Sequence, residues 1–124
     1  MANILIVEDE AIVAMTMSAV LDLAGHHVVG IADDATSAVK QVARSRPDLA
    51  LVDIKLANNS DGIETALRLK ARHPVKVVFV SGHLDSHTQK RAATVEPVGY
   101  VVKPYSAQRL LKIVSIASAP ASAA

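Results

Sequence analysis

The sequence predicts an α/β fold in which helices cover both faces of a five-stranded parallel sheet. Five short apolar runs rich in Val and Ile lie along the chain, and segments of helical length separate them. The first run, ILIV at residues 4–7, is typical of a strand buried on both faces, although the run alone is also compatible with a buried helix. Regular alternation of the two kinds of segment favours parallel strands joined by crossover helices.

The expected strands follow from these apolar runs. After residues 4–7 they are HVVGIA (27–32), LALVD (49–53), KVVFVS (76–81) and GYVVK (99–103).

The segments between the strands carry helix signals. Three of them stop at residues that commonly end helices, namely 11–25 at Gly25, 35–47 before Pro47 and 61–74 before Pro74. Helical spacing gives the third segment a stripe of Ile63, Ala66, Leu67 and Lys70. The last segment, 106–118, has Ser106 as an N-cap candidate and an apolar stripe of Leu110, Leu111, Val114 and either Ile116 or Ala117.

The fourth helical segment, residues 84–97, is poor in large apolar residues. Beyond alanines it offers Leu84 and Val95. We therefore expect its helix to pack loosely on the sheet.

Composition indicates one globular domain, because 124 residues with 51% hydrophobic and 20% charged residues suffice for a core. We expect this domain to span residues 1–118, followed by a disordered tail at 119–124, whose small residues and proline bury little. A net charge of +1 points neither to nucleic acid nor to an anionic membrane. No cysteine, leader or membrane-length apolar run is present, so we expect a soluble cytoplasmic protein.

Charged and hydroxyl side chains follow four of the expected strands. They are Glu8 and Asp9 after the first, Asp53 at the end of the third, Ser81 of the fourth and Lys103 of the fifth. Ligands of open parallel sheets bind beyond the carboxyl ends of the strands, so we expect these five residues to converge. Asp33, which follows the second strand, need not belong to the set.

This combination of groups suits phosphoryl transfer. Mg²⁺ is held by one or two carboxylates and leaves room for phosphate oxygens. A further carboxylate can then act as a nucleophile and form an aspartyl phosphate. A lysine and a hydroxyl can hold the oxygens of the transferred group, since such transfer depends mainly on positioning and charge stabilisation.

The sequence resembles the receiver domain of two-component response regulators, of the single-domain chemotaxis type. The resemblance rests on "ED" (Glu8, Asp9), "LVDIKL" (Asp53), "VFVSG" (Ser81) and "VVKPY" (Lys103), in this order. It implies a flavodoxin-like strand order 2-1-3-4-5, Mg²⁺ held by the acidic pair and Asp53, and transfer of a phosphoryl group from a histidine kinase to Asp53. It further implies that Ser81 and Lys103 contact that group.

The resemblance implies several finer features as well. The backbone carbonyl of Lys55 would complete the metal site, and Tyr100 would be the switch aromatic. Lys55 and His83 occupy the positions whose side chains tune the lifetime of the phosphoryl group. The resemblance also implies a cis bond between Lys103 and Pro104, whereas only about 5–6% of X-Pro bonds are cis in general.

The sequence also departs from the family pattern. The loop "DIKLANNSDG" lacks the usual Met-Pro pair and is one residue longer before Gly62, and "TVEPVGY" replaces the usual approach to the last strand. These differences concern loop geometry and the output surface. They leave the acid, hydroxyl and lysine positions intact.

The sequence thus predicts a stand-alone receiver that signals through a conformational switch, or a phosphorelay intermediate or sink. Its partners would be a histidine kinase or phosphotransfer protein and an unknown protein on the face of the fourth helix, fifth strand and fifth helix, with no nucleic acid and no membrane. It would catalyse its own phosphorylation and dephosphorylation and no other reaction. The alternative is a receiver-like module that docks partners without phosphorylation.

Two other classes rank lower. A phosphohydrolase would need a second acid two residues after the nucleophile, where Lys55 stands. A flavin carrier would need aromatic or glycine-rich loops, and the chain has only three aromatic residues, one Phe and two Tyr.

Overall fold

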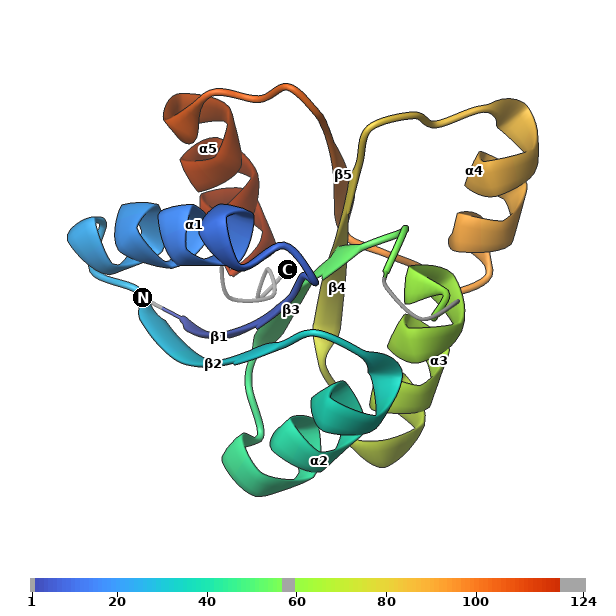
Figure 1. Cartoon of the computed structure of the whole chain (residues 1–124), viewed down its shortest axis with the longest axis horizontal. Helices are drawn as coiled ribbons and strands as arrows, with labels where there is room; N and C mark the ends of the chain where they lie inside the picture. The colour runs from blue at the N-terminus through green and yellow to red at the C-terminus, as the bar shows by residue number, and fades with distance from the viewer. Residues whose placement is uncertain (1, 57–59, 119–124) are drawn as a thin grey trace, which may run out of the picture.

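The computed structural model describes residues 2–56 and 60–118, in which five strands alternate with five helices (Figure 1). The predicted tail at 119–124 and part of the loop before Gly62 lie outside these residues, so the boundary at residue 118 stays a prediction. The elements are β1 Asn3–Val7, α1 Ala11–Leu23, β2 His27–Ala32, α2 Ala35–Ser45, β3 Leu49–Asp53, α3 Gly62–Arg72, β4 Lys76–Ser81, α4 Ser86–Ala93, β5 Gly99–Val102 and α5 Ala107–Ala117.

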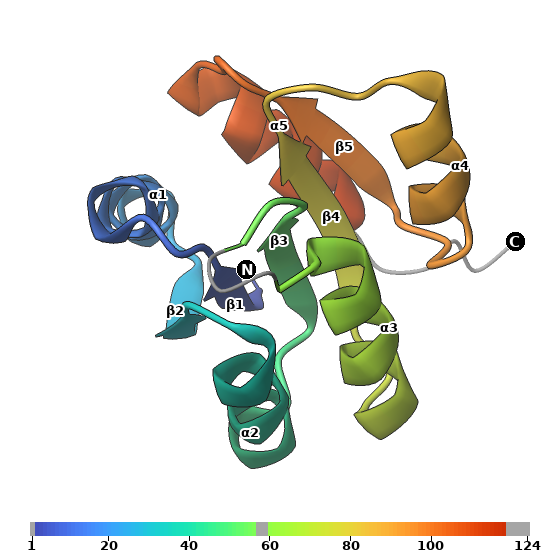
Figure 2. The ribbon, with the colours of Figure 1, turned by 45° about the vertical axis from the view of Figure 1, so that its right-hand side comes forward.

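The strands form one parallel sheet in the order β2-β1-β3-β4-β5, which confirms the predicted fold class and strand order. Helices α1 and α5 cover one face, and α2, α3 and α4 cover the other (Figures 1 and 2). Because all strands run the same way, their carboxyl ends lie along one edge of the sheet. No helix in the described parts of the chain is long and apolar enough to cross a membrane.

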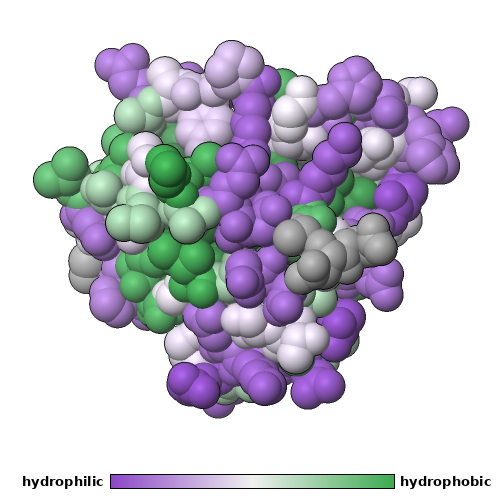
Figure 3. All heavy atoms as spheres, viewed as in Figure 1, coloured by the Kyte–Doolittle hydropathy of each residue, from purple (hydrophilic) through white to green (hydrophobic). Residues whose placement is uncertain are grey.

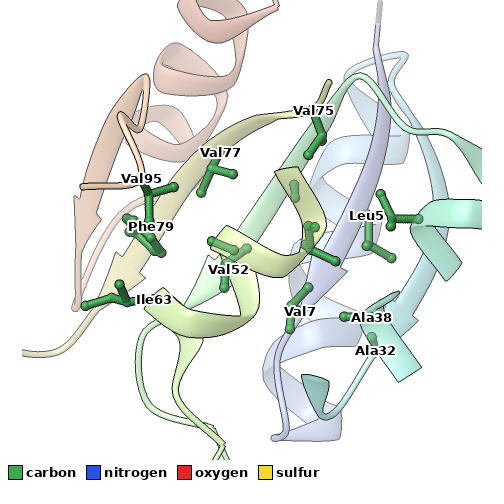
Figure 4. Packing of buried hydrophobic residues seen from close by; sticks show 14 of the residues in the cluster. Leu5, Val7, Ala32, Ala38, Val52, Ile63, Val75, Val77, Phe79 and Val95 are labelled. Atoms are coloured by element: carbon green, nitrogen blue, oxygen red, sulfur yellow. The ribbon is translucent and has the colours of Figure 1, made fainter. Parts of the chain in front are cut away.

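Successive side chains of the buried strands point to opposite faces of the sheet and pack into two apolar cores. On the side of α2, α3 and α4, residues such as Leu5, Val52 and Phe79 pack with Ile63 of α3 (Figure 4). On the other side, Ile4 and its neighbours pack against α1 and α5. Strands buried on both faces explain why the central runs of the sequence are continuously apolar rather than alternating.

The structure corrects details of the predicted helices. Leu69, rather than Leu67, is buried in α3, where Leu67 is 44% exposed. Lys70 turns its ammonium group to the carbonyl oxygen of Val95, at 2.7 Å. Of the two residues left as alternatives for the apolar stripe of α5, Ala117 is buried and Ile116 is 61% exposed.

Capping residues define several helix ends. Ser106 accepts a hydrogen bond from the backbone N–H of Arg109, as predicted for an N-cap. Gly25 follows the C-cap of α1 with φ of +90°, a conformation that glycine adopts without strain. The first strand begins one residue earlier than the sequence indicates, at Asn3, and the last ends one residue earlier, at Val102.

Helix α4 makes a small apolar contact with the rest of the molecule. Ala92 is its one buried residue, and Leu84 and Val95, which flank the helix, complete the contact. Arg91 of α4 also forms an ion pair with Asp61, the N-cap residue of α3. The helix is therefore attached partly by a polar contact at the start of α3.

Gly62 permits the close approach between α3 and the end of β3. A methyl group at this position would overlap the carbonyl oxygen of Asp53 and lie 2.7 Å from the Cα atom of Ile54. These are backbone atoms, which cannot move aside cheaply. Gly82 has nothing within 4 Å of the same substituent.

We therefore expect Gly62→Ala to lower the free energy of unfolding by about 2 kcal/mol or more, because the backbone near Asp53 must shift. Gly82→Ala is the matched control and should change it by less than about 0.5 kcal/mol. Urea denaturation of both variants measures the difference. Equal stabilities of the two variants would contradict the close approach.

Candidate functional site

Backbone hydrogen bonds continue beyond the strand ends and fix where the site residues lie relative to one another along the strand direction. The N–H of Glu8 donates to the carbonyl of Ala32, at 2.9 Å, and that of Ile54 to Val80, at 3.0 Å. The N–H of Lys103 donates to the carbonyl of Ser81, at 2.7 Å. The sheet therefore places the residues that follow β1, β3, β4 and β5 at one edge.

Lys103 joins two of the carboxylates. Its ammonium nitrogen lies 2.9 Å from Oδ2 of Asp53 and 3.3 Å from Oε1 of Glu8. The second oxygen of Asp53 accepts the N–H of Lys55, at 3.0 Å, and that of Glu8 accepts the N–H of Glu10, at 3.2 Å. All four carboxylate oxygens of these two residues are thus partnered.

Burial makes this group of charges costly. Glu8 is 2% exposed, and its burial, together with the neighbouring charge of Asp53, raises its pKa to about 7. The backbone N–H of Glu10 and the charge of Lys103 oppose this rise. Burial disfavours the charged form of Lys103, but the hydrogen bond and charge of Asp53, followed by those of Glu8, raise the pKa of the lysine.

The three acids are placed to share a cation. Oxygens of Glu8, Asp9 and Asp53 all lie within 4.8 Å of one another. Oxygens on opposite sides of one Mg²⁺ ion would be about 4.2 Å apart, so small side-chain movements suffice for joint coordination. An all-oxygen set of negative charge is also the chemistry that this hard cation prefers. The residues present therefore fit the metal.

A hollow of about 470 Å³ opens over the acids. Six of the predicted site residues line it, namely Asp9, Asp53, Lys55, Ser81, His83 and Lys103. Glu8 lies beneath them and is buried. Asp53 is 7% exposed and lines the hollow.

Ser81 is at the hollow, but its hydroxyl group is engaged by its own loop. The hydroxyl donates to the carbonyl oxygen of His83, at 2.8 Å, and accepts the N–H of the same residue, at 3.1 Å. The imidazole of His83 is exposed and lies 3.8 Å from a carboxylate oxygen of Asp85.

Tyr100 lies apart from the hollow. Its ring centroid is 6.2 Å from that of Phe79, and the ring is partly buried against the core on the side of α2, α3 and α4. Asp33 lines a separate hollow between β2 and α2, so it is not part of the site. The bond between Lys103 and Pro104 is cis, as the resemblance implies.

Several residues in the site and near it are not evident in the sequence. Glu10, Leu56 and Gly82 also line the hollow. Asp61 caps α3 by accepting the N–H of Ile63, at 2.8 Å, while its other oxygen pairs with Arg91. Asp-Gly is a turn signal in the sequence, but no local pattern connects it to an arginine 30 residues later.

The raised pKa of Glu8 predicts a pH dependence of the metal-free protein. Between about pH 4.5 and 7 the folded protein holds a proton on Glu8 that the unfolded chain has lost. The contribution of Glu8 to the free energy of unfolding is therefore fully present below pH 4.5 and lost as the pH rises to 7. Denaturation with a chelator present, at several pH values, should show a shallower fall across this interval for Glu8→Gln. Identical profiles would contradict the assignment.

Charge crowding predicts a second effect on stability. Asp53→Asn removes one of two neighbouring buried charges and leaves Glu8 as the partner of Lys103. We expect the melting temperature of the metal-free variant to rise by a few degrees, equivalent to about 1 kcal/mol. Differential scanning calorimetry with a chelator tests this. A lower melting temperature would show that the Lys103–Asp53 pair outweighs the repulsion.

Comparisons with known proteins identify the same family. Residues 4–115 match the model of the response regulator receiver domain. The phyllosphere-induced regulator PhyR of Methylorubrum extorquens is 35% identical over 91% of this chain and 42% of its own length. The transcriptional regulatory protein PdtaR of Mycobacterium tuberculosis is 30% identical over 93% of this chain and 56% of its own length. The chain thus spans about half the length of these relatives.

A solved structure gives the same result for the fold. The signal receiver domain of a modulated diguanylate cyclase from Desulfovibrio desulfuricans is 38% identical, with a TM-score of 0.87 over 94% of this chain and 93% of that one. Sequence and structure therefore agree over nearly the whole chain. The chain belongs to the response regulator receiver domain family.

Proposed function

We propose that this chain accepts a phosphoryl group on Asp53 from a histidine kinase or phosphotransfer protein. Receiver domains typically carry out phosphorylation-dependent signalling and are generally not enzymes in themselves. The observation that carries the proposal is the position of the Asp53 carboxylate, which lines an open hollow beside two further acids and pairs with Lys103. The chain then signals to a protein partner, or passes the group on as a phosphorelay intermediate or sink.

The acidic cluster would hold the metal ion of the reaction. Receiver domains typically bind Mg²⁺ at an acidic pocket, and the proposed ligands are Glu8, Asp9, Asp53 and the backbone carbonyl of Lys55. When bound, the ion neutralises charge on the acids and on the phosphate oxygens. Asp9 is accessible to solvent, which suits a site that keeps water molecules on the metal.

The transfer itself needs one nucleophile and several positioning groups. A carboxylate oxygen of Asp53 attacks phosphorus while the bond from phosphorus to the donor's nitrogen breaks and the electron pair leaves with that nitrogen. Lys103 lies 2.9 Å from Asp53, so its ammonium group is in place to pair with an oxygen of the transferred group. Ser81 would supply a hydrogen bond to another oxygen.

The contacts of Ser81 indicate how the signal would leave the site. To reach a phosphoryl oxygen, its hydroxyl must give up the hydrogen bond to the carbonyl of His83. In the proposed switch, movement of Ser81 and its loop is coupled to Tyr100, which lies one strand away on β5 and packs on Phe79. The output face would be α4, β5 and α5, where Val102 is 48% exposed.

Two side chains at the rim are proposed to set the lifetime of the phosphoryl group. Lys55 and His83 both line the hollow, so each can affect access of water to phosphorus.

The absence of enzymatic activity on other molecules and a cytoplasmic location stay predictions.

A module that docks partners without phosphorylation is the alternative. An acid, hydroxyl and lysine set retained around one hollow favours phosphorylation, because a pure docking module would have no use for buried charges that destabilise it.

Intact mass after treatment with acetyl phosphate separates the two functions. With Mg²⁺ the wild-type chain should gain one phosphoryl group, and with a chelator it should gain none. Asp53→Asn should gain none in either case. Asp33→Asn is the matched control, because Asp33 follows a neighbouring strand but lines a different hollow, and it should behave as wild type.

Two results would contradict the proposed function. If the wild-type chain gains no mass with Mg²⁺, the docking function is favoured. If Asp53→Asn still gains mass, the acceptor is a different residue.

A further inference from the structure

A short antiparallel bridge between Lys55 and Asp61 closes the loop that follows β3. Two backbone hydrogen bonds flank the bridge, from Gly62 to Ile54, at 2.8 Å, and from Leu56 to Ser60, at 3.3 Å. In a pair flanked in this way, the N–H and C=O groups of the two opposed residues point away from each other. The N–H of Lys55 accordingly donates to Oδ1 of Asp53, at 3.0 Å, and the bridge does not use the carbonyl oxygen of Lys55.

The side chain of Asp61 connects this loop to two helices. Oδ1 accepts the N–H of Ile63 at the start of α3, at 2.8 Å, and Oδ2 forms an ion pair with Arg91 of α4. Burial acts to raise the pKa of Asp61, but the hydrogen bond from Arg91, followed by that from Ile63, holds the pKa below its ordinary value. Asp61 is therefore charged at neutral pH, and the loop, α3 and α4 meet at one carboxylate.

Helix α4 has few other contacts that fix its position. Ala92 is its one buried residue, and hydrophilic residues cover the outer surface in the region of α4 (Figure 3). Both views of the ribbon place the last turn of α4 next to the start of α3 (Figures 1 and 2). Arg91 lies in this last turn, and within the described chain it is the one residue of α4 that forms an ion pair.

The order of the loop matters for metal binding. A ligand that is already held in place loses less conformational freedom when the ion binds, so binding is stronger. Of the two backbone hydrogen bonds that flank the bridge, the one between Leu56 and Ser60 is long, at 3.3 Å. The ion pair with α4 adds a restraint on Asp61, directly opposite Lys55.

We propose that Arg91 is a positioning residue for the metal site, because it holds Asp61 and thereby fixes the carbonyl group of Lys55 for Mg²⁺. The inference rests on the proposed function, in which that carbonyl is a metal ligand. Since coupling between two sites is reciprocal, an ion at the acids also restrains α4. The output face is thus connected to the site through Arg91 as well as through Tyr100.

The charge of Arg91 by itself would have the opposite effect on the metal. A cation near the acids repels Mg²⁺, so its removal should strengthen metal binding if the guanidinium group acted only through its charge. A positioning role requires that its removal weakens metal binding. The sign of the change in affinity therefore separates the two effects.

Titration of the unphosphorylated chain with Mg²⁺, followed by the NMR signal of the Lys55 amide, measures this sign. Arg91→Gln should raise the dissociation constant about two- to fivefold, the size expected for one partly exposed ion pair. Arg91→Lys keeps the charge and should recover part of the loss.

Lys90→Gln is the matched control for this titration. Lys90 is the neighbouring exposed cation of α4, and it forms no ion pair within residues 2–56 and 60–118. Its replacement removes the same charge without touching Asp61. The variant should bind Mg²⁺ as tightly as wild type or slightly more tightly.

The other partner of the ion pair gives a second test. Asp61→Asn keeps a residue that caps α3 but removes the charge that Arg91 binds. It should also weaken Mg²⁺ binding, and adding Arg91→Gln to it should weaken binding no further, because the two residues act as a unit. Both side chains are partly exposed, and circular dichroism checks that the variants are folded.

Amide hydrogen exchange tests the reverse direction, from the metal to the helix. Saturating Mg²⁺ should slow exchange in α4 of the wild-type chain and of Lys90→Gln, and it should have no such effect in Arg91→Gln. High salt should also remove the effect from the wild-type chain, since dissolved ions screen the pair.

Two results would overturn the positioning role and leave the proposed function intact. They are a wild-type chain that binds Mg²⁺ no more tightly than Arg91→Gln, and exchange in α4 of the wild-type chain that Mg²⁺ leaves unchanged. A wild-type chain that binds no Mg²⁺ at all would contradict the metal site of the proposed function, and the role of Arg91 with it.

Discussion

The contact of Lys103 with two buried carboxylates is the interaction on which the site depends. Glu8 and Asp53 are almost fully removed from solvent, and one ammonium group lies within 3.3 Å of both. Without it, two neighbouring negative charges would face an apolar core on one side and each other on the other. The carboxylate of Glu8 responds by holding its proton more tightly, with a pKa near 7. The site thus consists of two buried carboxylates and one ammonium group that offsets their repulsion, at one edge of an apolar sheet.

The parallel sheet is what makes this balance possible. Residues separated by 45 to 95 positions in the chain meet because every strand delivers its last residue to the same edge. Backbone hydrogen bonds from Glu8, Ile54 and Lys103 extend the sheet by one residue beyond β1, β3 and β5. The apolar cores on both faces hold these backbones in place.

The fold and the convergence of the polar residues at one sheet edge could be predicted from the sequence because each depends on a regular pattern. Continuous apolar runs indicate a doubly covered parallel sheet, and polar residues that directly follow such runs must lie at its edge. Which residue of a helix is buried was harder to predict, as with Leu69 and Ala117, because near-equivalent apolar residues occupy adjacent positions and tertiary packing decides between them. The Asp61–Arg91 pair could not be predicted, since it joins two loosely related segments through space.

That ion pair has a consequence for how α4 is held. Both side chains are partly exposed, with 46% and 28% of their surface open to solvent, and exposed pairs contribute about 0–1 kcal/mol. Dissolved salt screens such pairs far more than it weakens apolar contacts. The position of α4 is therefore sensitive to the ionic strength of its surroundings, whereas α3, anchored by Ile63, Ala66 and Leu69, is not. One layer of the molecule thus combines a helix fixed by apolar packing with a neighbour held partly by an ion pair.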